Sequence, residues 1–323
     1  MNKLLPTLCL FASLFLASFP LTAARHAVIL SGGVWVDLAP GAATTSLYYA
    51  DDINASGTIA GAAADTVTGD LGAFRYSSNV LTPFAVEQWL LHDGVRINAS
   101  GQVAGTAPGS PSNGVPRAVL YNAGVSTYLF TLAADQANPS FATGINDSGT
   151  IVGCVGQPPN GHAFSFSGGT ETNIGSNKCA FDINSSGVVV GISYPPGDER
   201  LFTYASGVTT DLGSLGPYCG RYYPRINDAG VIVFGPFYYD GTRHAIPKSD
   251  GDECSAATAI NGNRIVGYGA KSHHPWLYTI GGSLVDLGLS ESGGGNYIRV
   301  VPLGINSMGQ VVGWADDLST ADR

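Results

Sequence analysis

The chain repeats one short motif seven times. The third copy, GINDSGTIVG at residues 144–153, shows its parts: Ile-Asn, two further residues, Gly, and an apolar stretch that ends in Gly. The repeated asparagines are Asn54, Asn98, Asn146, Asn184, Asn227, Asn261 and Asn306. Their separations are 44, 48, 38, 43, 34 and 45 residues, with a mean of 42, which lies in the range typical of β-propeller blades.

Each copy of the motif predicts a β-hairpin. Asn is favoured at the first position of a type I turn, where its side chain bonds to the backbone two residues on, and the Gly takes the left-handed conformation that returns the chain as a strand. The sixth copy is one residue shorter and carries Asn261-Gly262, the signature of a two-residue turn. The fifth copy has Phe234 in place of the closing Gly, so we expect that hairpin to pack differently.

A second strand pair lies between successive motifs. Apolar residues alternate there across a tight turn, usually one with Gly, which again predicts a hairpin. The segments are 26–39, 73–85, 117–130, 162–175, 201–213, 237–246 and 275–288. Each repeat therefore supplies four short strands.

The repeats predict an all-β fold, a seven-bladed β-propeller with four-stranded blades. A content of 44 Gly, 18 Pro and only 12% charged residues among 323 fits an all-β protein with many turns. Residues 25–323 then form one domain, which begins with the second hairpin of one unit and stops after the first hairpin of another. A mixed blade of N- and C-terminal strands would close the ring and protect its strand edges. An open solenoid or a different barrel is the alternative.

Residues 1–24 have the features of a secretory signal peptide. Lys3 is followed by an apolar run through Leu21 and by small residues, and the expected cleavage is after Ala24. The expected location is therefore secreted, either extracellular or periplasmic, with an uncleaved membrane anchor as the alternative. The net charge of -9 argues against nucleic acid or anionic lipid as a partner.

Cleavage at that point would leave four cysteines, an even number that suits an oxidising compartment. They are Cys154, Cys179, Cys219 and Cys254. Three pairings are possible, and we favour Cys154 with Cys179 and Cys219 with Cys254, because the partners then lie in neighbouring repeats. A metal site is the alternative, but the spacing lacks the close Cys-x-x-Cys pairs of zinc ligands. No metal and no other cofactor is predicted.

Three sequence elements recur in a fixed order along the chain. His-Ala-Phe stands at His162–Phe164, Asp-Leu-Gly stands at Asp211–Gly213 and Asp286–Gly288, and the Ile-Asn element stands in all seven copies. This order resembles the unit of the HAF repeat family of predicted extracellular proteins, over about residues 25–315. The resemblance implies an exported, propeller-like repeat protein and assigns no activity.

Strand alternation divides the connections between two rims. All the short turns, including those with the repeated asparagines, lie on one rim, which we call the tight-turn rim. The longer connections lie on the opposite, long-connection rim, which comprises roughly residues 38–51, 61–72, 86–95, 106–116, 131–142, 154–161, 175–181, 192–200, 214–223, 247–257, 268–274 and 289–302. Binding residues are common on such loops, because a rigid scaffold leaves them free to vary.

Aromatic residues on the long-connection rim are the candidate binding residues. Their rings could stack on sugars or anchor a protein partner, and the alternative for each is packing between blades. They are Tyr48, Tyr49, Trp89, Tyr194, Tyr218, Tyr222, Tyr223 and Tyr297.

Charged residues precede the repeated Ile in two pairs of adjacent units. We expect ion pairs between blades, Asp52 with Arg96 and Asp182 with Arg225, because a charge at a blade interface is costly unless it is paired. The alternative is that these charges face solvent near the strand ends.

The chain carries no recognisable catalytic motif. It has no Gly-x-Ser-x-Gly, no His-Glu-x-x-His and no phosphate-binding glycine loop, and His26 and His162 share one phase of the repeat, which indicates scaffold roles. No catalytic residue is therefore assigned. The sequence favours an exported binding module for carbohydrate or protein. The alternatives are a secreted polysaccharide hydrolase or lyase and a surface-structural protein.

Overall fold

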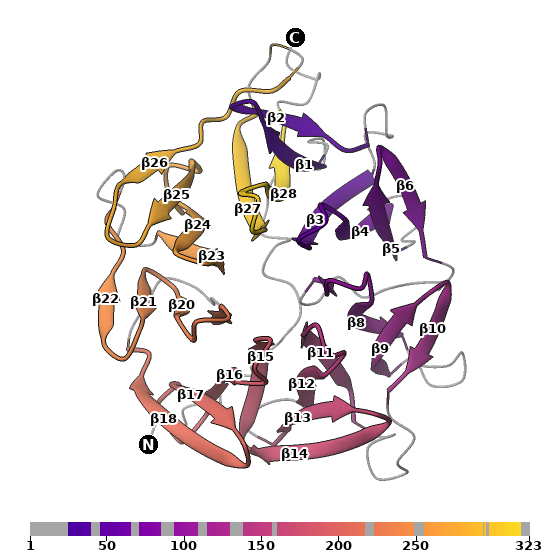
Figure 1. The fold of residues 1–323 in the computed structure, drawn as a ribbon, viewed down its shortest axis with the longest axis vertical. Coiled ribbons are helices and arrows are strands. Elements are labelled where there is room, and N and C mark those ends of the chain that lie inside the picture. Colours follow the sequence, from indigo (N-terminus) through magenta and orange to yellow (C-terminus); the bar gives the residue numbers. More distant parts are fainter. Residues whose placement is uncertain are drawn as a thin grey trace, which may run out of the picture.

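A computed structural model shows the architecture. It describes residues 25–39, 46–65, 71–84, 94–108, 115–129, 138–156, 160–216, 223–248, 255–292, 294 and 297–317. These residues form 28 β-strands and no helix, so within them no helix could cross a membrane. The strands make seven blades around a central axis (Figure 1), which confirms the predicted all-β, seven-bladed propeller.

The blades follow one another along the chain, and their strands have these bounds. Blade 1 contains β3 (Ser46–Ile53), β4 (Ile59–Asp65), β5 (Leu71–Ser77) and β6 (Val80–Pro83). Blade 2 contains β7 (Arg96–Ile97), β8 (Val103–Pro108), β9 (Pro116–Asn122) and β10 (Val125–Tyr128). Blade 3 contains β11 (Ser140–Ile145), β12 (Ile151–Val155), β13 (His162–Ser167) and β14 (Thr170–Ser176). Blade 4 contains β15 (Lys178–Ile183), β16 (Val189–Ser193), β17 (Arg200–Ala205) and β18 (Val208–Ser214).

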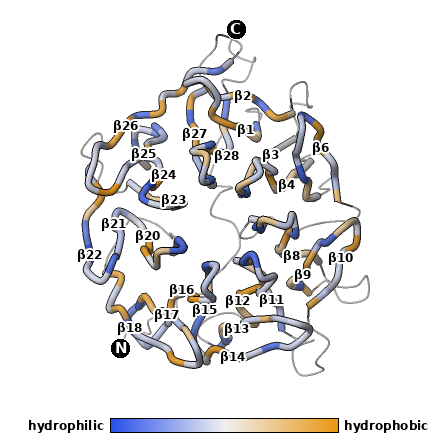
Figure 2. Tube along the Cα trace, in the orientation of Figure 1, coloured by the Kyte–Doolittle hydropathy of each residue, from blue (hydrophilic) through white to orange (hydrophobic). Residues whose placement is uncertain are grey.

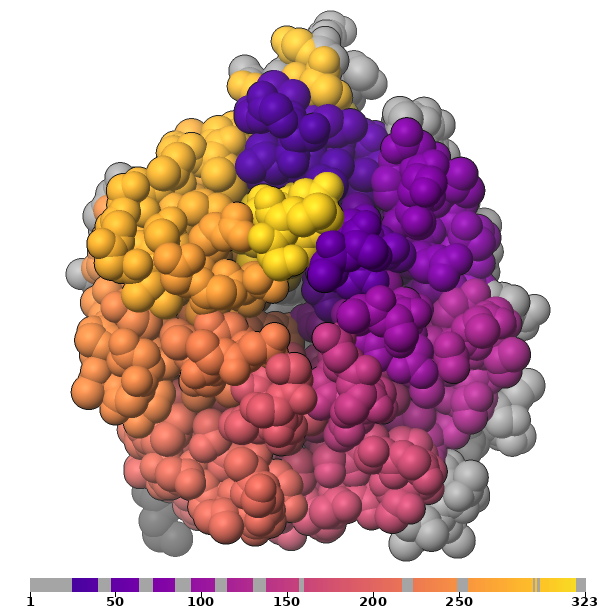
Figure 3. Space-filling model, viewed as in Figure 1, coloured from indigo at the N-terminus to yellow at the C-terminus, as the bar shows by residue number. Residues whose placement is uncertain are grey.

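The remaining three blades complete the ring. Blade 5 contains β19 (Arg225–Ile226), β20 (Ile232–Phe234), β21 (Phe237–Tyr239) and β22 (Arg243–Ala245). Blade 6 contains β23 (Ala256–Asn261), β24 (Arg264–Tyr268), β25 (Pro275–Thr279) and β26 (Leu284–Asp286). Blade 7 contains β27 (Arg299–Ile305), β28 (Val311–Asp316), β1 (Arg25–Ser31) and β2 (Val34–Asp37). The first strand of each unit lies nearest the axis (Figure 1), and Figure 3 shows the blades packed around a central hollow.

Blade 7 joins the two ends of the described chain. Strand β28 pairs antiparallel with β1, and the register places Arg25 opposite Asp316 and Ala27 opposite Trp314. One parallel bridge, from Arg25 to Leu47, also connects this sheet to blade 1. The predicted closure by a mixed blade of N- and C-terminal strands is confirmed.

The Asn motifs form the predicted turns. In the third copy the N–H of Gly149 donates to the carbonyl of Asn146 (2.9 Å), and the side-chain Oδ1 of Asn146 accepts from the N–H of Thr150 (3.0 Å). Gly149 has a φ of 80°, in the left-handed region that other residues rarely adopt. The predicted left-handed Gly is therefore present, but the Asn146 side chain bonds to the backbone four residues on, and the predicted bond to the N–H two residues on is seen in the first copy, from Ser56 to Asn54.

The hydrophobic core is divided among the seven interfaces between adjacent blades. Between blades 3 and 4, for example, Val152 and Ala163 pack against Ala180 and Phe202. Comparable clusters occupy the other six interfaces. Figure 2 shows apolar stretches in blades around the whole ring. Successive side chains of a strand point to opposite faces, and all five residues of β12 are buried, so both faces of this strand pack against neighbours. Each blade is thus stabilised mainly by the blades beside it.

The closing Gly of the Asn motif lies beneath an aromatic ring of the next strand. A Cβ atom on Gly153 would lie 2.9 Å from the Phe164 ring, and Phe164 is the Phe of His-Ala-Phe. Gly191 has the same relation to Phe202. The two sequence elements are therefore linked, because the ring needs a residue without a side chain below it.

Blade 5 departs from this arrangement, as the sequence predicts. Phe234 takes the glycine position and pairs in register with Phe237, with their ring centroids 5.8 Å apart. The Arg243 guanidinium lies over the Phe237 ring, 3.8 Å from its centroid. Two large rings at adjacent positions replace the ring-over-glycine contact, and the strands of this blade are only two or three residues long.

A disulfide joins Cys154 of blade 3 to Cys179 of blade 4, with their Cα atoms 5.0 Å apart. This confirms the first predicted pair and the expectation that partners lie in neighbouring repeats. Cys219 and Cys254, the predicted second pair, lie outside the described residues, as does the predicted signal peptide at residues 1–24.

Candidate functional site

The long-connection rim of blade 7 carries a cluster of charged and aromatic side chains from three blades. We call it the closure cluster: Arg25, Arg299, Trp314 and Asp316 of blade 7, Tyr49 of blade 1 and Tyr268 of blade 6. Trp314, Tyr268 and Tyr49 pack together. Arg25 lies in β1, and Trp314 and Asp316 lie in β28, the two strands whose pairing completes the ring, so the site exists only in the closed propeller.

Sheet register places the charged members in one row. Arg299 of β27 is opposite Asp316 of β28, and Asp316 is opposite Arg25 of β1. Directly opposed residues project to the same face of a sheet, so the three side chains line up across the blade. Trp314 lies two residues before Asp316 and therefore on the same face.

Arg25 is fully engaged within the protein. Its Nε donates to Asp316 Oδ1 (2.7 Å), its Nη2 donates to Asp316 Oδ2 (2.9 Å), and its Nη1 donates to the Tyr49 hydroxyl (2.9 Å). Its Cζ lies 3.8 Å from the centroid of the Trp314 ring. Burial alone would lower the pKa of Arg25, but the hydrogen bonds and charge of Asp316 and Tyr49 outweigh burial and raise it. Asp316 is thus committed to Arg25 through both oxygens.

Arg299 has fewer partners. Its Cζ lies 4.9 Å from the Trp314 centroid and 5.8 Å from the Tyr268 centroid. Its side chain hydrogen-bonds to Tyr268. Within the described residues its Nε is buried without a hydrogen-bond partner, and none of the ion pairs includes Arg299. Burial, helped by the charge of Arg25, lowers the pKa of Arg299, whereas Tyr268 and Asp316 act in the opposite direction. The cluster therefore holds two guanidinium groups and one carboxylate.

The opposite face of blade 7 carries a second polar group of side chains on the same rim. His26 Nδ1 lies 2.8 Å from Asp37 Oδ2, and His26 Nε2 lies 3.5 Å from Asp317 Oδ2. Because a carboxylate only accepts, Nδ1 carries the proton in the first contact. The hydrogen bond to Asp37 is the main reason that the pKa of His26 is raised, and burial opposes it.

Tyr297 packs beside this histidine. The two ring centroids are 5.9 Å apart, and Tyr297 is 2% exposed with a hydroxyl that has no hydrogen-bond partner among the residues that the structure describes. Burial, together with the charges of nearby carboxylates, raises the pKa of Tyr297. A buried hydroxyl without a partner is uncommon, because its desolvation costs about 1–3 kcal/mol. His26, Asp317 and Tyr297 therefore form the arrangement of the described chain that most resembles acid–base machinery.

Part of this second group belongs to the repeat. His274 pairs with Asp286 (2.8 Å) in blade 6, and Arg200 pairs with Asp211 (2.7 Å) in blade 4. The first residue of the His-Ala-Phe element and the Asp of the Asp-Leu-Gly element thus meet in several blades, as His26 and Asp37 do in blade 7. The predicted scaffold role of His26 agrees with this recurrence, and Tyr297 and Asp317 are additions made in blade 7.

Comparison with known proteins identifies the fold but no family. A scan against models of protein families finds no match, and a search of curated proteins finds none either. Among solved structures, a catalytically inactive variant of virginiamycin B lyase from Staphylococcus aureus with quinupristin has a TM-score of 0.55 and 11% identity, covering 90% of this chain and 98% of that chain. A streptogramin B lyase has a TM-score of 0.50 and 11% identity, covering 84% and 93%.

Two further matches cover less of the other protein. A prolyl endopeptidase has a TM-score of 0.52 and 10% identity, covering 75% of this chain and 42% of that chain. TolB from Acinetobacter baumannii has a TM-score of 0.43 and 13% identity, covering 81% and 61%, so this chain spans less than two thirds of the length of either protein. These likenesses show the fold alone. The resemblance to the HAF repeat family stays a prediction.

The predicted binding tyrosines fall into separate groups. Tyr49 of blade 1 packs against Trp314 on one face of blade 7, and Tyr297 packs against His26 on the other. Tyr48 packs near Phe74, with ring centroids 6.2 Å apart. Tyr194 and Tyr223 pack against the core between blades 4 and 5, where Tyr223 stacks on Phe181 at 4.5 Å. The other three candidates, Trp89, Tyr218 and Tyr222, lie outside the described residues. For Tyr48, Tyr194 and Tyr223 the alternative of packing between blades describes the observed contacts.

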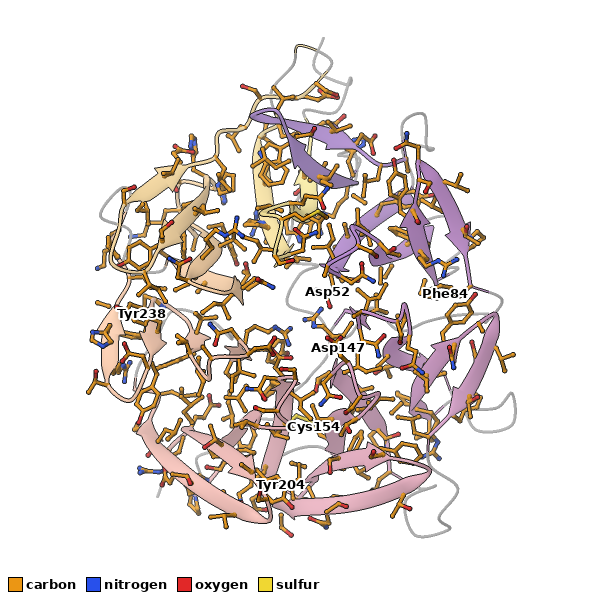
Figure 4. All side chains as sticks on the ribbon, in the orientation of Figure 1. Asp52, Phe84, Asp147, Cys154, Tyr204 and Tyr238 are labelled. Atoms are coloured by element: carbon orange, nitrogen blue, oxygen red, sulfur yellow. A yellow bond between two sulfur atoms is a disulfide. The ribbon has the colours of Figure 1, made fainter. Side chains whose placement is uncertain are left out.

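The predicted ion pair between Asp52 and Arg96 is wrong in its partner. Asp52 lies near the axis (Figure 4), and its Oδ2 accepts from the backbone N–H of Ile97 in blade 2 (3.0 Å). Arg96 Nη1 donates to the backbone carbonyls of Val95 (2.9 Å) and Asp51 (3.4 Å). Both side chains stay at the blade interface as predicted, but each is satisfied by backbone.

The second predicted pair, Asp182 with Arg225, is also wrong in its partner, because backbone groups satisfy both side chains. Asp182 Oδ2 accepts from the N–H of Ile226 (3.0 Å), and Arg225 Nη1 donates to the carbonyl of Phe181 (2.8 Å). No ion pair joins Asp182 to Arg225. The sequence could not show this, because the shift of one blade relative to the next along the ring axis determines which backbone groups an Asp side chain reaches.

The inner strands also place a buried carboxylate near the axis. Asp51 is 6% exposed, and within the described residues its carboxylate accepts one hydrogen bond, a long one (3.4 Å) from the N–H of Val95. Burial is the main cause that raises the pKa of Asp51 to about 7, although Arg96 and Val95 act in the opposite direction. Sequence reasoning did not single out this residue, since nothing in its motif separates it from Asp52.

Proposed function

We propose that this protein is an exported binding module, and that its ligand contacts the long-connection rim around blade 7. The two rims differ in a way that supports this choice. The tight-turn rim is built from turns of two to five residues, such as 32–33 and 54–58. Connections on the long-connection rim range from residue 177 alone to residues 287–298. A rigid scaffold with variation on one side is typical of binding proteins.

The closure cluster is the observation that carries the proposal. Its two guanidinium groups share one carboxylate and lie over aromatic rings, and the Nε of Arg299 lacks a partner. Interface hot spots are enriched in Trp, Tyr and Arg, which are the residue types gathered in this cluster. A partly buried cation without a matching anion is stabilised when a ligand supplies one.

Export is supported by the disulfide between Cys154 and Cys179. Such bonds persist in oxidising compartments and are rare in the cytosol of ordinary organisms. The signal-like character of residues 1–24 points to the same location.

A secreted hydrolase or lyase acting on polysaccharide is the second candidate. It is favoured by His26, which lies 3.5 Å from Asp317 and has its ring 5.9 Å from that of Tyr297. Imidazole, carboxylate and phenol are side-chain groups that serve as general acids and bases, and their catalytic hydrogen bonds are often long before a substrate binds. Propeller scaffolds also occur in enzymes, since virginiamycin B lyase has a TM-score of 0.55 to this chain, but 11% identity transfers no residue roles.

A binding array combined with a turnover screen separates the two candidates. The full chain, secreted with its own N-terminal segment, is tested against glycans, polysaccharides and secreted proteins, and each bound polysaccharide is assayed for released products. Binding without products supports the module. Products that disappear in Tyr297→Phe support the enzyme, because this change removes only a hydroxyl without a partner. The matched control is Met308→Ala, which alters an exposed residue of blade 7 on the tight-turn rim.

A further inference from the structure

The closure cluster has an uneven charge count that points to the chemistry of its ligand. Arg299, Asp316 and Arg25 form one row across three neighbouring strands. Both oxygens of Asp316 accept from Arg25. The row therefore contains two cations and one anion, and the anion is already used.

We propose that Arg299 binds the carboxylate of an acidic sugar, a uronate residue, at the long-connection rim of blade 7. This inference rests on the binding function proposed above and names the ligand class for it. The first support is geometric. A guanidinium presents five N–H donors in a planar fork that matches a carboxylate. Arg299 is half-buried with its Nε covered, and within the described residues it forms no ion pair, so the end of its fork is the part left for an added carboxylate.

The surroundings of Arg299 would strengthen its binding of an added anion. Trp314 is 3% exposed and Tyr268 is 8% exposed, so the guanidinium lies against apolar rings rather than in bulk water. Burial makes the charged form of Arg299 less favourable, as its lowered pKa indicates. A carboxylate beside Arg299 would offset the cost of burying its charge, because an ion pair is stronger where water is partly excluded.

Arg25 is the contrasting residue in the same row. All three of its nitrogens donate to protein acceptors, two to Asp316 and one to Tyr49. It therefore fixes the position of Asp316 and leaves ligand recognition to Arg299. Losing Arg25 would also free Asp316, so variants of Arg25 would not isolate the proposed contact.

Asp316 argues for a sugar acid over a simple carboxylate. Its charge lies opposite Arg299 in the register and opposes a second bare carboxylate nearby. Each Asp316 oxygen accepts one hydrogen bond from Arg25 and keeps a second lone pair, so it can still accept from a sugar hydroxyl, as can the Tyr268 hydroxyl. A uronate carries a carboxylate beside several hydroxyl groups, which matches this combination, whereas the carboxylates of polypeptides lack such neighbours.

The net charge of -9 sharpens the test. Long-range attraction would favour cationic partners, so binding of an acidic sugar by this chain has to come from local contacts. The single sugars D-galacturonate and D-glucuronate are therefore the probes, and D-galactose and D-glucose are the neutral counterparts of the same shape. N-acetyl-aspartate and N-acetylglycine stand for the carboxylates of a polypeptide.

Binding is measured by isothermal titration calorimetry and by the shift in melting temperature of the secreted full chain. We expect one uronate to bind and to raise the melting temperature, with at least tenfold weaker binding of its neutral counterpart. Arg299→Gln should weaken uronate binding at least tenfold, and Arg299→Lys should fall between, because it keeps the charge and loses the fork. Arg75→Gln, at an exposed arginine of blade 1, makes the same charge change and should bind as the unaltered chain does.

Three results would overturn the inference. They are equal binding by Arg299→Gln and the unaltered chain, equal binding of uronate and neutral sugar, and preference for the acetylated amino acids, which would assign the site to a polypeptide carboxylate. Tyr268→Phe guards against misfolding of Arg299 variants, since removing one hydroxyl should lower uronate affinity severalfold with the fold intact. If the array finds a ligand whose binding ignores Arg299, the proposed module stands and this inference falls. If the array finds none, the module itself falls.

Discussion

The side-chain amide of Asn306 donates a hydrogen bond to the backbone carbonyl of Asn54, 3.0 Å away and 252 residues earlier in the sequence. Equivalent bonds run from Asn54 to Asn98, from Asn98 to Asn146, from Asn146 to Asn184 and from Asn184 to Asn227. Each of these five asparagines thus caps its own turn with Oδ1 and bonds to the next blade with Nδ2. The contact from Asn306 carries this chain of bonds across the closure of the ring.

The sixth repeat is where the chain of bonds changes. Asn227 donates to the carbonyl of Gly262 (2.6 Å), and the step from blade 6 to blade 7 is made by Arg264, whose Nη2 donates to the carbonyl of Ser307 (2.7 Å). The shorter turn at Asn261 removes the usual donor. A longer side chain three residues later spans the same gap.

Replacing Asn306 by Ala is expected to lower the free energy of unfolding by about 2 kcal/mol. The change removes the bond to the Asn54 carbonyl, which keeps only its bond from Gly57, and it removes the acceptor of the Gln310 N–H. Urea unfolding measures the difference. Asn261→Ala is the matched control, because within the described residues the Asn261 amide makes no bond to another blade, and its loss should be about 0.5 kcal/mol or less. Equal losses for the two variants would contradict a role between blades.

The repeat shows how far sequence reasoning reaches. Turn chemistry explains Asn-x-x-Gly and predicts the hairpins. The number of copies and the units at the two ends then predict the blade count and the closure. The second role of Asn146, as donor to the Asn184 carbonyl, could not be predicted, because a motif within one blade does not determine how the next blade is shifted along the ring axis relative to it. The same gap explains the wrong partners of Asp52 and Asp182.

The candidate site was harder to predict than the fold. Tyr49 and Tyr297 could be proposed from their place on the rim, but Tyr223 on the same rim is stacked against Phe181. Arg299 carried no signal in the sequence, since its importance depends on the register that puts Asp316 between two arginines. The position of a residue in a long loop predicts the rim on which it lies. Only the pairing of strands that are distant in sequence shows which charged residues meet on that rim.

Gly153→Ala is expected to cost several kcal/mol. The added methyl group would overlap the carbonyl oxygen of Phe141 and lie 2.9 Å from the Phe164 ring, so either the ring or the strand pair would have to move. Gly168→Ala is the control. It has a φ of 58° and open space around its Cα, so only backbone strain of about 1 kcal/mol is expected. The comparison is made by thermal unfolding, and a Gly153→Ala protein as stable as Gly168→Ala would show that the ring-over-glycine contact is not needed.

Removing the disulfide by Cys154→Ala with Cys179→Ala is expected to lower stability by about 2–4 kcal/mol. The bond ties blade 3 to blade 4, so its loss frees one interface of the ring. Unfolding is followed with and without reductant. In the presence of reductant, the unaltered chain and the double variant should have the same free energy of unfolding. Any further fall that reductant causes in the double variant would report the predicted second pair, Cys219 with Cys254. No effect of reductant on either protein would contradict both bonds.

Asp51→Asn is expected to change the dependence of stability on pH. The folded pKa of Asp51 is about 7, above its ordinary value of 3.8, so between these values the folded protein keeps a proton that the unfolded chain releases. The carboxyl therefore stabilises the fold at low pH, and its contribution declines as pH rises from about 4 and is lost above about 7, with a slope of at most about 1.4 kcal/mol per pH unit.

Asn at this position resembles the protonated carboxyl and does not titrate. Asp51→Asn should therefore match the unaltered chain near pH 4 and exceed it in stability at pH 8. Asp182, whose pKa is also raised to about 7 by burial, is present in both proteins, so the difference between them isolates Asp51. Asp52 and Arg96, the charged neighbours of Asp51, are likewise unchanged. Urea unfolding from pH 4 to pH 8 gives the two curves. Parallel curves would mean that Asp51 is ionised throughout, and that the backbone and Arg96 compensate its burial.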